Sequence, residues 1–446
     1  MPVRKQMRHP AQVIVGGFGF AVLTGTLLLA LPAATTGPES ASPLTALFTS
    51  TSAVCVTGLI VVDTETHWSV FGEVVIMCLI QVGGLGIMTL ATLFALLVSG
   101  RVGLRARLLA QAETKTLSAS DVRRVVRNVV IFSLVSEAVL ALVLCLRFLL
   151  GYHEGFGRSL YLGVFHSISS FNNAGFALWP DSLVRFASDA WICLPVSLAV
   201  IVGGLGFPVV FELARSWRRP RRWSVLTRIT LAVTGALLVL GTLAITVFEW
   251  SNPRTLGALP ESSRFAAGFF TAVMPRSGGF NILQLSEMKN ESWLVTDILM
   301  FIGGGSAGTA GGIKVTTFGL LAFVIWAELR GESQVNVGHR RLPDTVQRQA
   351  LTIALLGVGL VAAGTFALLA LSDQTLDEVA FEVISAFGTV GLSIGATTAS
   401  MPSAGQALLV ALMFIGRVGP VTLFSALALR ERTRHYELPE ERPIVG

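Results

Sequence analysis

Residues 43–59 read PLTALFTSTSAVCVTGL, a short apolar segment that ends in a run with a single glycine, Gly58. The apolar part, Pro43–Val54, is too short to cross a bilayer, because a spanning helix needs about 20 residues. Glycine then allows backbone dihedral angles that a side chain forbids. The stretch therefore predicts a helix that enters the membrane part of the way and ends in a specialised turn.

Three further copies of this pattern follow along the chain. Their apolar segments are Leu160–Phe171, Ser262–Met274 and Leu376–Phe387. The runs after them carry Gly175, Gly279 and Gly391, which follow the preceding glycine at intervals of 117, 104 and 112 residues. One such segment alone is typical of an interfacial loop helix capped by glycine, but four in register indicate an internal repeat of pore helices.

Eight longer apolar stretches flank these segments, and each is long enough to span a bilayer. They are Ala11–Leu31, Val70–Val98, Val129–Leu150, Ala190–Ala214, Val225–Phe248, Leu294–Trp326, Ala350–Leu371 and Ala404–Leu429. The chain then reads as span, pore helix and span in four units, 1–110, 111–222, 223–340 and 341–430, followed by a cytoplasmic tail over 431–446. We predict an all-α polytopic membrane protein whose four tandem units surround a pseudo-fourfold central pore.

The composition agrees with a membrane protein, since 52% of the residues are hydrophobic and only 13% are charged. Soluble domains carry about 25% charged residues, which excludes a secreted scaffold and most cytosolic enzymes. The four cysteines lack metal-ligand spacing, and the sequence contains no Ser–His–Asp set and no paired catalytic carboxylates. We therefore predict that the chain is not an enzyme and holds no cofactor of its own.

Positive charge is distributed unevenly over the predicted loops. One side of the membrane holds 25 of the 33 Lys and Arg residues, and the other side holds six. Because basic loops stay in the cytoplasm, we predict a multi-pass protein of the plasma (inner) membrane with both termini cytoplasmic. The basic run Arg218–Arg222 is interpreted as an anchor on anionic membrane lipids and not as a nucleic-acid site.

The runs that follow the short helices have the properties of an ion-binding filter. A helix that enters from outside directs the partly negative end of its dipole toward the membrane centre, where it favours a cation. Small residues let the carbonyl oxygens turn inward and replace the water shell of a monovalent cation. The predicted filter residues are Val56, Thr57, Gly58, Asn173, Ala174, Gly175, Ser277, Gly278, Gly279, Thr389, Val390 and Gly391.

At this point the four runs resemble a known family, the Trk/Ktr/HKT superfamily of K+ transporters. The matching residues are 51–59 (TSAVCVTGL), 171–176 (FNNAGF), 275–280 (PRSGGF) and 387–392 (FGTVGL). The first unit begins almost at the N-terminus, which favours the Ktr-type membrane (pore) subunit. In the third run Gly278 precedes Gly279, and Gly279 aligns better with the other filter glycines.

The resemblance implies a function and partners for this chain. It implies K+ uptake through one pore per subunit, with K+ bound at the filter and Na+ as an alternative ion. It also implies a homodimer that binds a cytoplasmic nucleotide-binding regulatory ring.

The sixth span contains a second feature of functional interest, residues 303–312 with the sequence GGGSAGTAGG. Glycine costs about 1 kcal/mol relative to alanine in a helix, so this run predicts a broken helix that lines a cavity. The resemblance assigns such a loop to gating, and its spacing differs from that of a nucleotide-binding Walker loop. The predicted gate residues are Gly303, Gly304, Gly305, Ser306, Gly308, Gly311, Gly312, Lys314 and Arg417.

Arg417 belongs to this gate because it lies within a span, where an arginine is costly and usually functional. Facing the loop, it would donate hydrogen bonds to loop carbonyls and place a positive barrier below the filter. The alternative is an arginine that extends to the membrane surface or pairs with Glu382 or Glu137.

Two other functions remain open from the sequence alone. A secondary carrier with alternating access for another cation or small solute would show inverted repeats and a charged pocket at the membrane midplane. A structural membrane scaffold would leave the four aligned glycine runs unexplained. The parallel repeats favour the pore.

Overall fold

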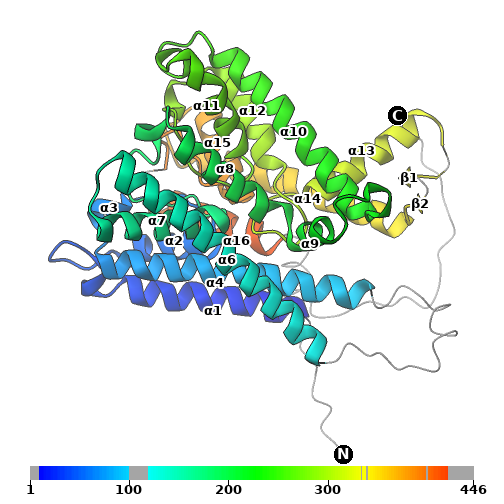
Figure 1. Ribbon diagram of the computed structural model, residues 1–446, viewed down its shortest axis with the longest axis horizontal. Helices are drawn as coiled ribbons and strands as arrows, with labels where there is room; N and C mark the ends of the chain where they lie inside the picture. The colour runs from blue at the N-terminus through cyan, green and yellow to red at the C-terminus, as the bar shows by residue number, and fades with distance from the viewer. Residues whose placement is uncertain (1–9, 100–118, 333, 338–339, 398–399, 420–446) are drawn as a thin grey trace, which may run out of the picture.

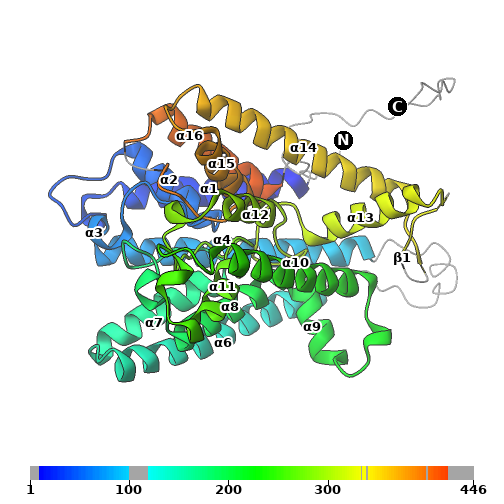
Figure 2. The same cartoon turned by 90° about the horizontal axis from the view of Figure 1, so that it is seen from above.

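The computed structural model describes residues 10–99, 119–332, 334–337, 340–397 and 400–419, and helices make up most of the secondary structure of these residues. The long helices run side by side along the longest axis of the molecule (Figures 1 and 2). The short helix α3 (Thr64–His67) lies at one end of this axis, and the hairpin of β1 (Asn336–Val337) and β2 (Arg340–Arg341) lies at the other.

The helices follow the predicted alternation of long and short segments. In the first half of the chain they are α1 (Pro10–Leu29), α2 (Pro43–Val54), α4 (Val70–Ser99), α6 (Ala119–Gly151), α7 (Phe156–Phe171), α8 (Ala190–Leu205) and α9 (Phe207–Ser216). In the second half they are α10 (Val225–Glu249), α11 (Glu261–Val273), α12 (Asn290–Phe301), α13 (Val315–Leu329), α14 (Asp344–Leu369), α15 (Leu376–Gly388) and α16 (Ser403–Val418). Short 3-10 turns occur at Pro32–Ala34, Val184–Phe186, Pro220–Arg222, Leu256–Ala258 and Leu285–Glu287.

The four predicted short helices are confirmed as α2, α7, α11 and α15. Local capping explains where two of them begin. Ser42 accepts a hydrogen bond from the backbone N–H of Thr45, and Thr375 and Glu378 form a reciprocal capping box at the start of α15.

Packing between the short and the long helices follows a cyclic order. Each short helix contacts the long helix that precedes or follows it in its own unit, and it also contacts a helix from the preceding unit. These second contacts join α7 to α4, α11 to α8, α15 to α12, and α2 to α16. The last contact brings residues near the two ends of the described chain together, and Figure 2 shows α2 beside α16.

Three described helical segments are long and apolar enough to cross a membrane by themselves: Arg123–Gly151, Val225–Glu249 and Asp344–Leu369. Their outer surfaces carry exposed large apolar side chains, including Leu142, Val247 and Phe366. A soluble protein would bury such side chains, whereas a lipid environment accommodates them.

The first and second predicted spans are helical as α1 and α4, and α4 covers the whole of Val70–Val98. Val315–Leu329 and Ser403–Val418 are apolar helices below the length of a full span over the described residues. The predicted break in the sixth span is confirmed, because α12 ends at Phe301 and α13 begins at Val315. The predicted tail over 431–446 lies outside the described residues.

The predicted fourth span, Ala190–Ala214, is wrong as a single helix. It consists of α8 and α9, which meet at an angle of 101°. The bend lies at Gly206, whose φ of +91° disfavours other residues, and Pro208 helps to start the new helix. A Cβ on Gly206 would collide with the carbonyl oxygen of Ser306, so the bend also makes room for the broken sixth span.

Candidate functional site

The four glycines of the repeated runs lie next to one another in the fold. A Cβ placed on Gly58 would lie 3.2 Å from the Cα of Gly175, and one on Gly175 would lie 2.6 Å from the Cα of Gly279. A Cβ on Gly279 would lie 2.5 Å from the carbonyl oxygen of Val390, and one on Gly391 would lie 3.0 Å from the Cα of Gly58. The four runs therefore contact one another in a closed cycle, in which the fourth run returns to the first. We call Gly58, Gly175, Gly279 and Gly391 the glycine ring.

All four ring glycines have a positive φ, a conformation that L-residues rarely adopt. The values are +89° at Gly58, +72° at Gly175, +75° at Gly279 and +92° at Gly391. Gly278 is absent from this set, and its N–H donates to the carbonyl oxygen of Met274 at 2.7 Å. The ring position in the third run therefore belongs to Gly279 and not to Gly278.

The residue two positions before each ring glycine is also left-handed, which the sequence does not predict. The φ values are +55° at Val56, +61° at Asn173, +68° at Ser277 and +47° at Thr389. For the β-branched Val56 and Thr389 this conformation is a true outlier. Such strain persists only where the surrounding structure imposes it, and it is concentrated at functional sites.

In three of the runs, the residue directly before the ring glycine forms the same backbone hydrogen bond to its short helix. The N–H of Thr57 donates to Ser52, that of Ala174 to Ser169 and that of Val390 to Ser385, at 2.8, 2.7 and 2.9 Å to the serine carbonyl oxygens. The run thus leaves each short helix through the same hydrogen bond in units one, two and four.

The serines that accept these bonds also use their side chains, and sequence reasoning missed them. The Oγ atoms of Ser52 and Ser385 accept the N–H groups of Gly58 and Gly391 at 3.0 and 3.1 Å. Ser169 instead donates to the carbonyl oxygen of Phe176 at 2.8 Å. The sequence does contain a pattern that could have indicated them, because a serine lies six residues before the ring glycine in the first, second and fourth units. The third unit has Val273 at this position.

Residues 303–312, the glycine loop, are held against the bend between α8 and α9. The N–H of Gly305 donates to the carbonyl oxygen of Gly204 at 2.7 Å, and that of Thr309 donates to Gly203 at 3.1 Å. A Cβ on Gly308 would lie 2.8 Å from the Gly204 carbonyl oxygen. A side chain at this position would push the loop away from α8.

The base of the loop is closed by backbone pairing. The N–H of Gly303 donates to the carbonyl oxygen of Ile313 at 2.9 Å, and Ile302 pairs with Ile313 in a parallel bridge. A Cβ on Gly303 would meet the carbonyl oxygen of Gly311, and one on Gly304 would lie 2.5 Å from the Ala310 side chain. Gly312 has a φ of +66°. The glycines at the base therefore allow the two arms of the loop to touch.

Arg417 is buried and reaches the glycine loop from α16. One guanidinium nitrogen donates to the carbonyl oxygen of Thr309, and the other donates to that of Gly83 in α4 at 3.2 Å. The alternative pairing with an acid is wrong. Glu382 is bonded to Ser393, Ile394 and Thr397, and Glu137 is bonded to Gln81, Ser133 and Asn172.

Side chains close to the loop in the sequence also form hydrogen bonds that hold it. The Nζ atom of Lys314 donates to the carbonyl oxygen of Ala310 at 2.5 Å. The hydroxyl groups of Ser306 and Thr316 lie 2.8 Å apart and share a hydrogen bond.

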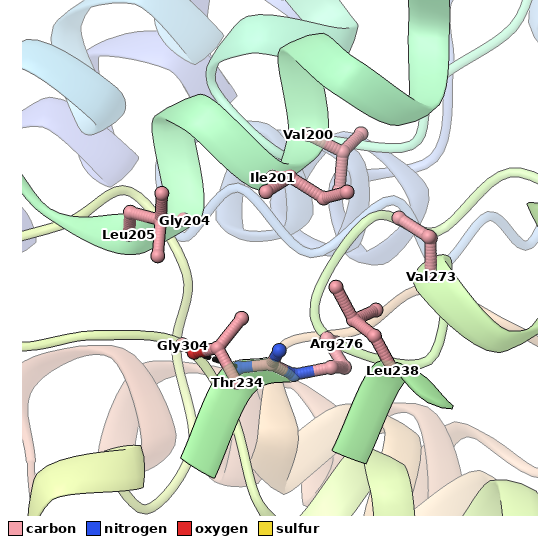
Figure 3. A pocket seen from close by; sticks show the side chains of 9 residues that line it. All are labelled: Val200, Ile201, Gly204, Leu205, Thr234, Leu238, Val273, Arg276 and Gly304. Carbon is pink, nitrogen blue, oxygen red and sulfur yellow. Dashed lines mark hydrogen bonds between the residues drawn. The ribbon is translucent and has the colours of Figure 1, made fainter. Parts of the chain in front are cut away.

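Arg276 is a further contact to the loop that the sequence did not predict. It lies directly before Ser277 of the third run, and its Nη2 donates to the Gly303 carbonyl oxygen at 3.2 Å and to Oγ1 of Thr234 at 3.3 Å. It lies beside a cavity of about 20 Å³ between α8, α10 and the end of α11 (Figure 3). The buried charge is thus directed to a loop carbonyl.

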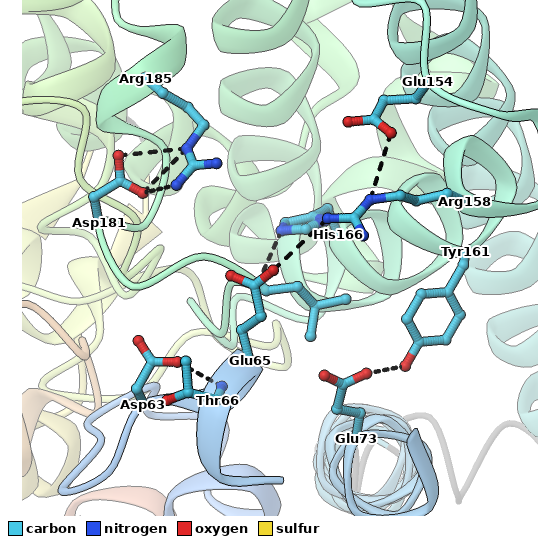
Figure 4. A network of polar contacts seen from close by, with 11 residues as sticks. Asp63, Glu65, Thr66, Glu73, Glu154, Arg158, Tyr161, His166, Asp181 and Arg185 are labelled. Carbon is cyan, nitrogen blue, oxygen red and sulfur yellow. Dashed lines mark hydrogen bonds and ion pairs between the residues drawn. The ribbon is translucent and has the colours of Figure 1, made fainter. Parts of the chain in front are cut away.

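Acidic side chains in α3 and in the loops near it form contacts with neighbouring groups (Figure 4). Asp63 caps α3 by accepting from the N–H of Thr66 at 3.0 Å, and Asp181 pairs with Arg185 at 2.7 Å. Glu65 lies 3.7 Å from Arg158. These contacts support the interpretation of these residues as ordinary loop charges.

Two further groups at this end are fixed by hydrogen bonds. Asp189 pairs with Arg147 at 2.7 Å and accepts a hydrogen bond from the hydroxyl group of Tyr152. Burial of Tyr152, together with this hydrogen bond, raises the pKa of its phenol to about 12. His166 is buried, with Nδ1 2.8 Å from the Leu162 carbonyl oxygen and Nε2 accepting from the N–H of Leu178. This is the geometry of a packed, hydrogen-bonded histidine and not of a metal ligand.

Comparison with known proteins gives full-length matches. The family described as "TrkH: Cation transport protein" matches residues 6–432. "Ktr system potassium uptake protein B" of Bacillus subtilis (strain 168) is 39% identical over 98% of this chain and 97% of its own length. "Potassium/sodium uptake protein NtpJ" of Enterococcus hirae is 34% identical over 100% of this chain and 98% of its own.

A solved structure has the same fold. The potassium transporter TrkH from Vibrio parahaemolyticus superimposes with a TM-score of 0.78 at 17% identity, and the match covers 96% of this chain and 87% of that one.

Proposed function

The chain belongs to the TrkH family of cation transport proteins, and from this membership we propose that it takes up K+ through a pore lined by the four glycine runs. The family prediction made from those runs is therefore confirmed. The relatives named as potassium and potassium/sodium uptake proteins support K+ as the main ion and Na+ as an alternative.

One observation carries this proposal: the same pair of left-handed residues recurs in all four runs around the closed glycine ring. Backbone that alternates between positive and negative φ turns successive carbonyl groups toward one side. Four such runs around one axis would present rings of carbonyl oxygens, which replace the hydration shell of a monovalent cation. The cyclic packing of the short helices supports the pseudo-fourfold arrangement.

We further propose that the glycine loop with Lys314 and Arg417 is the gate of this pore. The loop contacts the runs, and the buried Arg417 guanidinium holds one of its carbonyl groups. A positive charge at this depth would repel a cation that leaves the filter. The uneven distribution of Lys and Arg supports an orientation with both termini in the cytoplasm and the gate below the filter.

A partner chain is part of the proposal. The name of the Bacillus subtilis relative describes one component of a Ktr system, which supports a separate regulatory component. We propose that this component is a cytoplasmic ring and that the chain binds it as a homodimer. Mass measurement of the purified protein in detergent, alone and with a candidate ring, tests both parts.

The direct test is Rb+ uptake by K+-starved cells that express the wild-type chain or Gly391→Ser. A Cβ at Gly391 would collide with the carbonyl oxygen of Thr57, so we expect at least a roughly 10-fold loss of uptake, equivalent to about 1.4 kcal/mol.

The matched control is Gly395→Ser. Gly395 has a φ of +100°, but apart from its two chain neighbours no atom of the described residues lies within 4 Å of the point where a Cβ would lie. Equal loss in both variants, or normal uptake with Gly391→Ser, would contradict the proposed filter. No Rb+ uptake by the wild-type chain would contradict K+ transport itself.

A further inference from the structure

Two buried hydroxyl groups connect the glycine loop to the glycine runs. The Oγ atom of Ser277 donates to the carbonyl oxygen of Thr389 at 2.7 Å and accepts from the N–H of Gly311 at 3.1 Å. The Oγ1 atom of Thr309 donates to the side-chain oxygen of Asn173 at 2.8 Å. Through these bonds the loop reaches the second, third and fourth runs.

The packing around both hydroxyl groups is tight. A Cβ on Gly311 would collide with Oγ1 of Thr389. A Cβ on Gly203 would lie 2.9 Å from the Asn173 side-chain oxygen and 3.0 Å from Oγ1 of Thr309. Ser277, Thr309 and Asn173 are all fully buried. The loop therefore cannot move far while both hydrogen bonds remain.

The residues that receive these bonds are the strained ones. Asn173 and Ser277 have φ values of +61° and +68°, and Thr389, whose carbonyl oxygen accepts from Ser277, has +47°. A strained backbone persists only while its surroundings impose it. A loop that moves away breaks the bond from the Gly311 N–H to Ser277 and leaves the side-chain oxygen of Asn173 without the donor Thr309, while Ser277 keeps its bond to the Thr389 carbonyl oxygen. Part of the constraint on the strained residues is then removed.

We infer that Ser277 and Thr309 are positioning residues that couple the gate to the filter, so that loop opening changes the ion selectivity of the runs. This inference rests on the proposed function. Coupling is reciprocal, so a cation bound among the runs stabilises the closed loop by the same factor.

The first experiment measures the ratio of Rb+ to Na+ uptake in Ser277→Ala and Thr309→Val. Loss of one buried hydrogen bond is worth about 3- to 10-fold in an equilibrium. We expect the ratio of Rb+ to Na+ uptake to fall about 3- to 10-fold in each variant.

Controls separate coupling from general damage. Thr296→Val removes a buried hydroxyl whose Oγ1 donates only to its own helix, at the Ser292 carbonyl oxygen, and should leave the ratio unchanged. Ser277→Thr keeps a hydroxyl group and should restore the wild-type ratio. A β-branched residue fits there because Val56 and Thr389 occupy the equivalent positions with positive φ.

The second experiment measures the loop directly. Ala307→Cys is introduced together with Cys78→Ser, because Cys78 is exposed while the other three cysteines are buried. We expect K+, compared with choline, to slow thiol modification at position 307 about 3-fold or more. Adding Ser277→Ala should remove most of this protection.

The outcomes distinguish the two levels of the proposal. The coupling is wrong if Ser277→Ala and Thr309→Val keep both the Rb+/Na+ ratio and the K+ protection within about twofold of wild type. A change equal to that of Thr296→Val also contradicts it. If the wild-type chain takes up no Rb+, the proposed function fails and the coupling with it.

Discussion

The glycine ring and the glycine loop are both rich in glycine, but they are held in different ways. Each ring glycine follows its own short helix, and serines of those helices bond the runs locally in three of the four units. The loop occurs once. Lys314 and Ser306 bond it locally, but its contacts with distant elements are single ones, which Arg417, Arg276 and Ser277 supply and which Thr309 of the loop makes to Asn173. The ring is therefore repeated and fixed by its own short helices, whereas the position of the loop relative to the runs depends on contacts that occur once. This is the difference expected between a filter and a movable gate.

The largest effect expected from this comparison is loss of function in the ring. Gly175→Ala places a Cβ 2.6 Å from the Cα of Gly279 at a φ of +72°, where neither backbone can easily move. We expect Rb+ uptake to fall by at least about 10-fold. Gly331→Ala is the control, since Gly331 has a φ of +65° with open space around it. Uptake that falls equally in both would show that strain alone, and not the ring, is responsible.

The next effect has the opposite sign and concerns the loop. Arg417→Ala removes the hydrogen bonds to the Thr309 and Gly83 carbonyl oxygens, and bonds to a charged group are worth about 1.5–3 kcal/mol. We expect Rb+ uptake to rise about 10-fold in well-folded protein. A fall in uptake, with an unchanged size-exclusion profile, would contradict the gate.

A smaller effect is expected at the serines that hold the ring. Ser385→Ala leaves the N–H of Gly391 without its acceptor, so we expect the concentration of Rb+ at half-maximal uptake to rise about 2- to 10-fold. Ser372→Ala is the comparison, because its hydroxyl donates to the Leu368 carbonyl oxygen away from the runs. Equal shifts in the two variants would remove the role assigned to Ser385.

The smallest effect is expected at the outer end. Asp181→Asn removes a half-exposed ion pair with Arg185, and such pairs contribute about 0–1 kcal/mol. Rb+ uptake should stay within about twofold of wild type. A large loss would mean that this acid attracts cations to the pore mouth, contrary to its interpretation as a loop charge.

The short helices were predictable because local signals define them. Ser42 and Pro43 start α2 as an N-cap and a first-turn proline, and the glycine run follows its end directly. The break in the sixth span was predictable for the same reason, since six glycines within 303–312 oppose a helix.

Other features depend on contacts between distant residues, so the sequence alone did not reveal them. The bend at Gly206 lies in a continuous apolar run, and its purpose emerges only from the nearby Ser306 carbonyl group. Val56 is β-branched, and its type argues against the left-handed backbone that it adopts. Arg276 is bonded to Gly303, which lies 27 residues later in the glycine loop, and periodicity does not predict this contact.

The most direct test of the central claim is anomalous diffraction from crystals of the protein grown with Rb+. The account predicts Rb+ peaks on the axis enclosed by Gly58, Gly175, Gly279 and Gly391, at the level of the run carbonyl oxygens. Rb+ peaks elsewhere, or an ordered glycine ring without Rb+ on its axis, would contradict it.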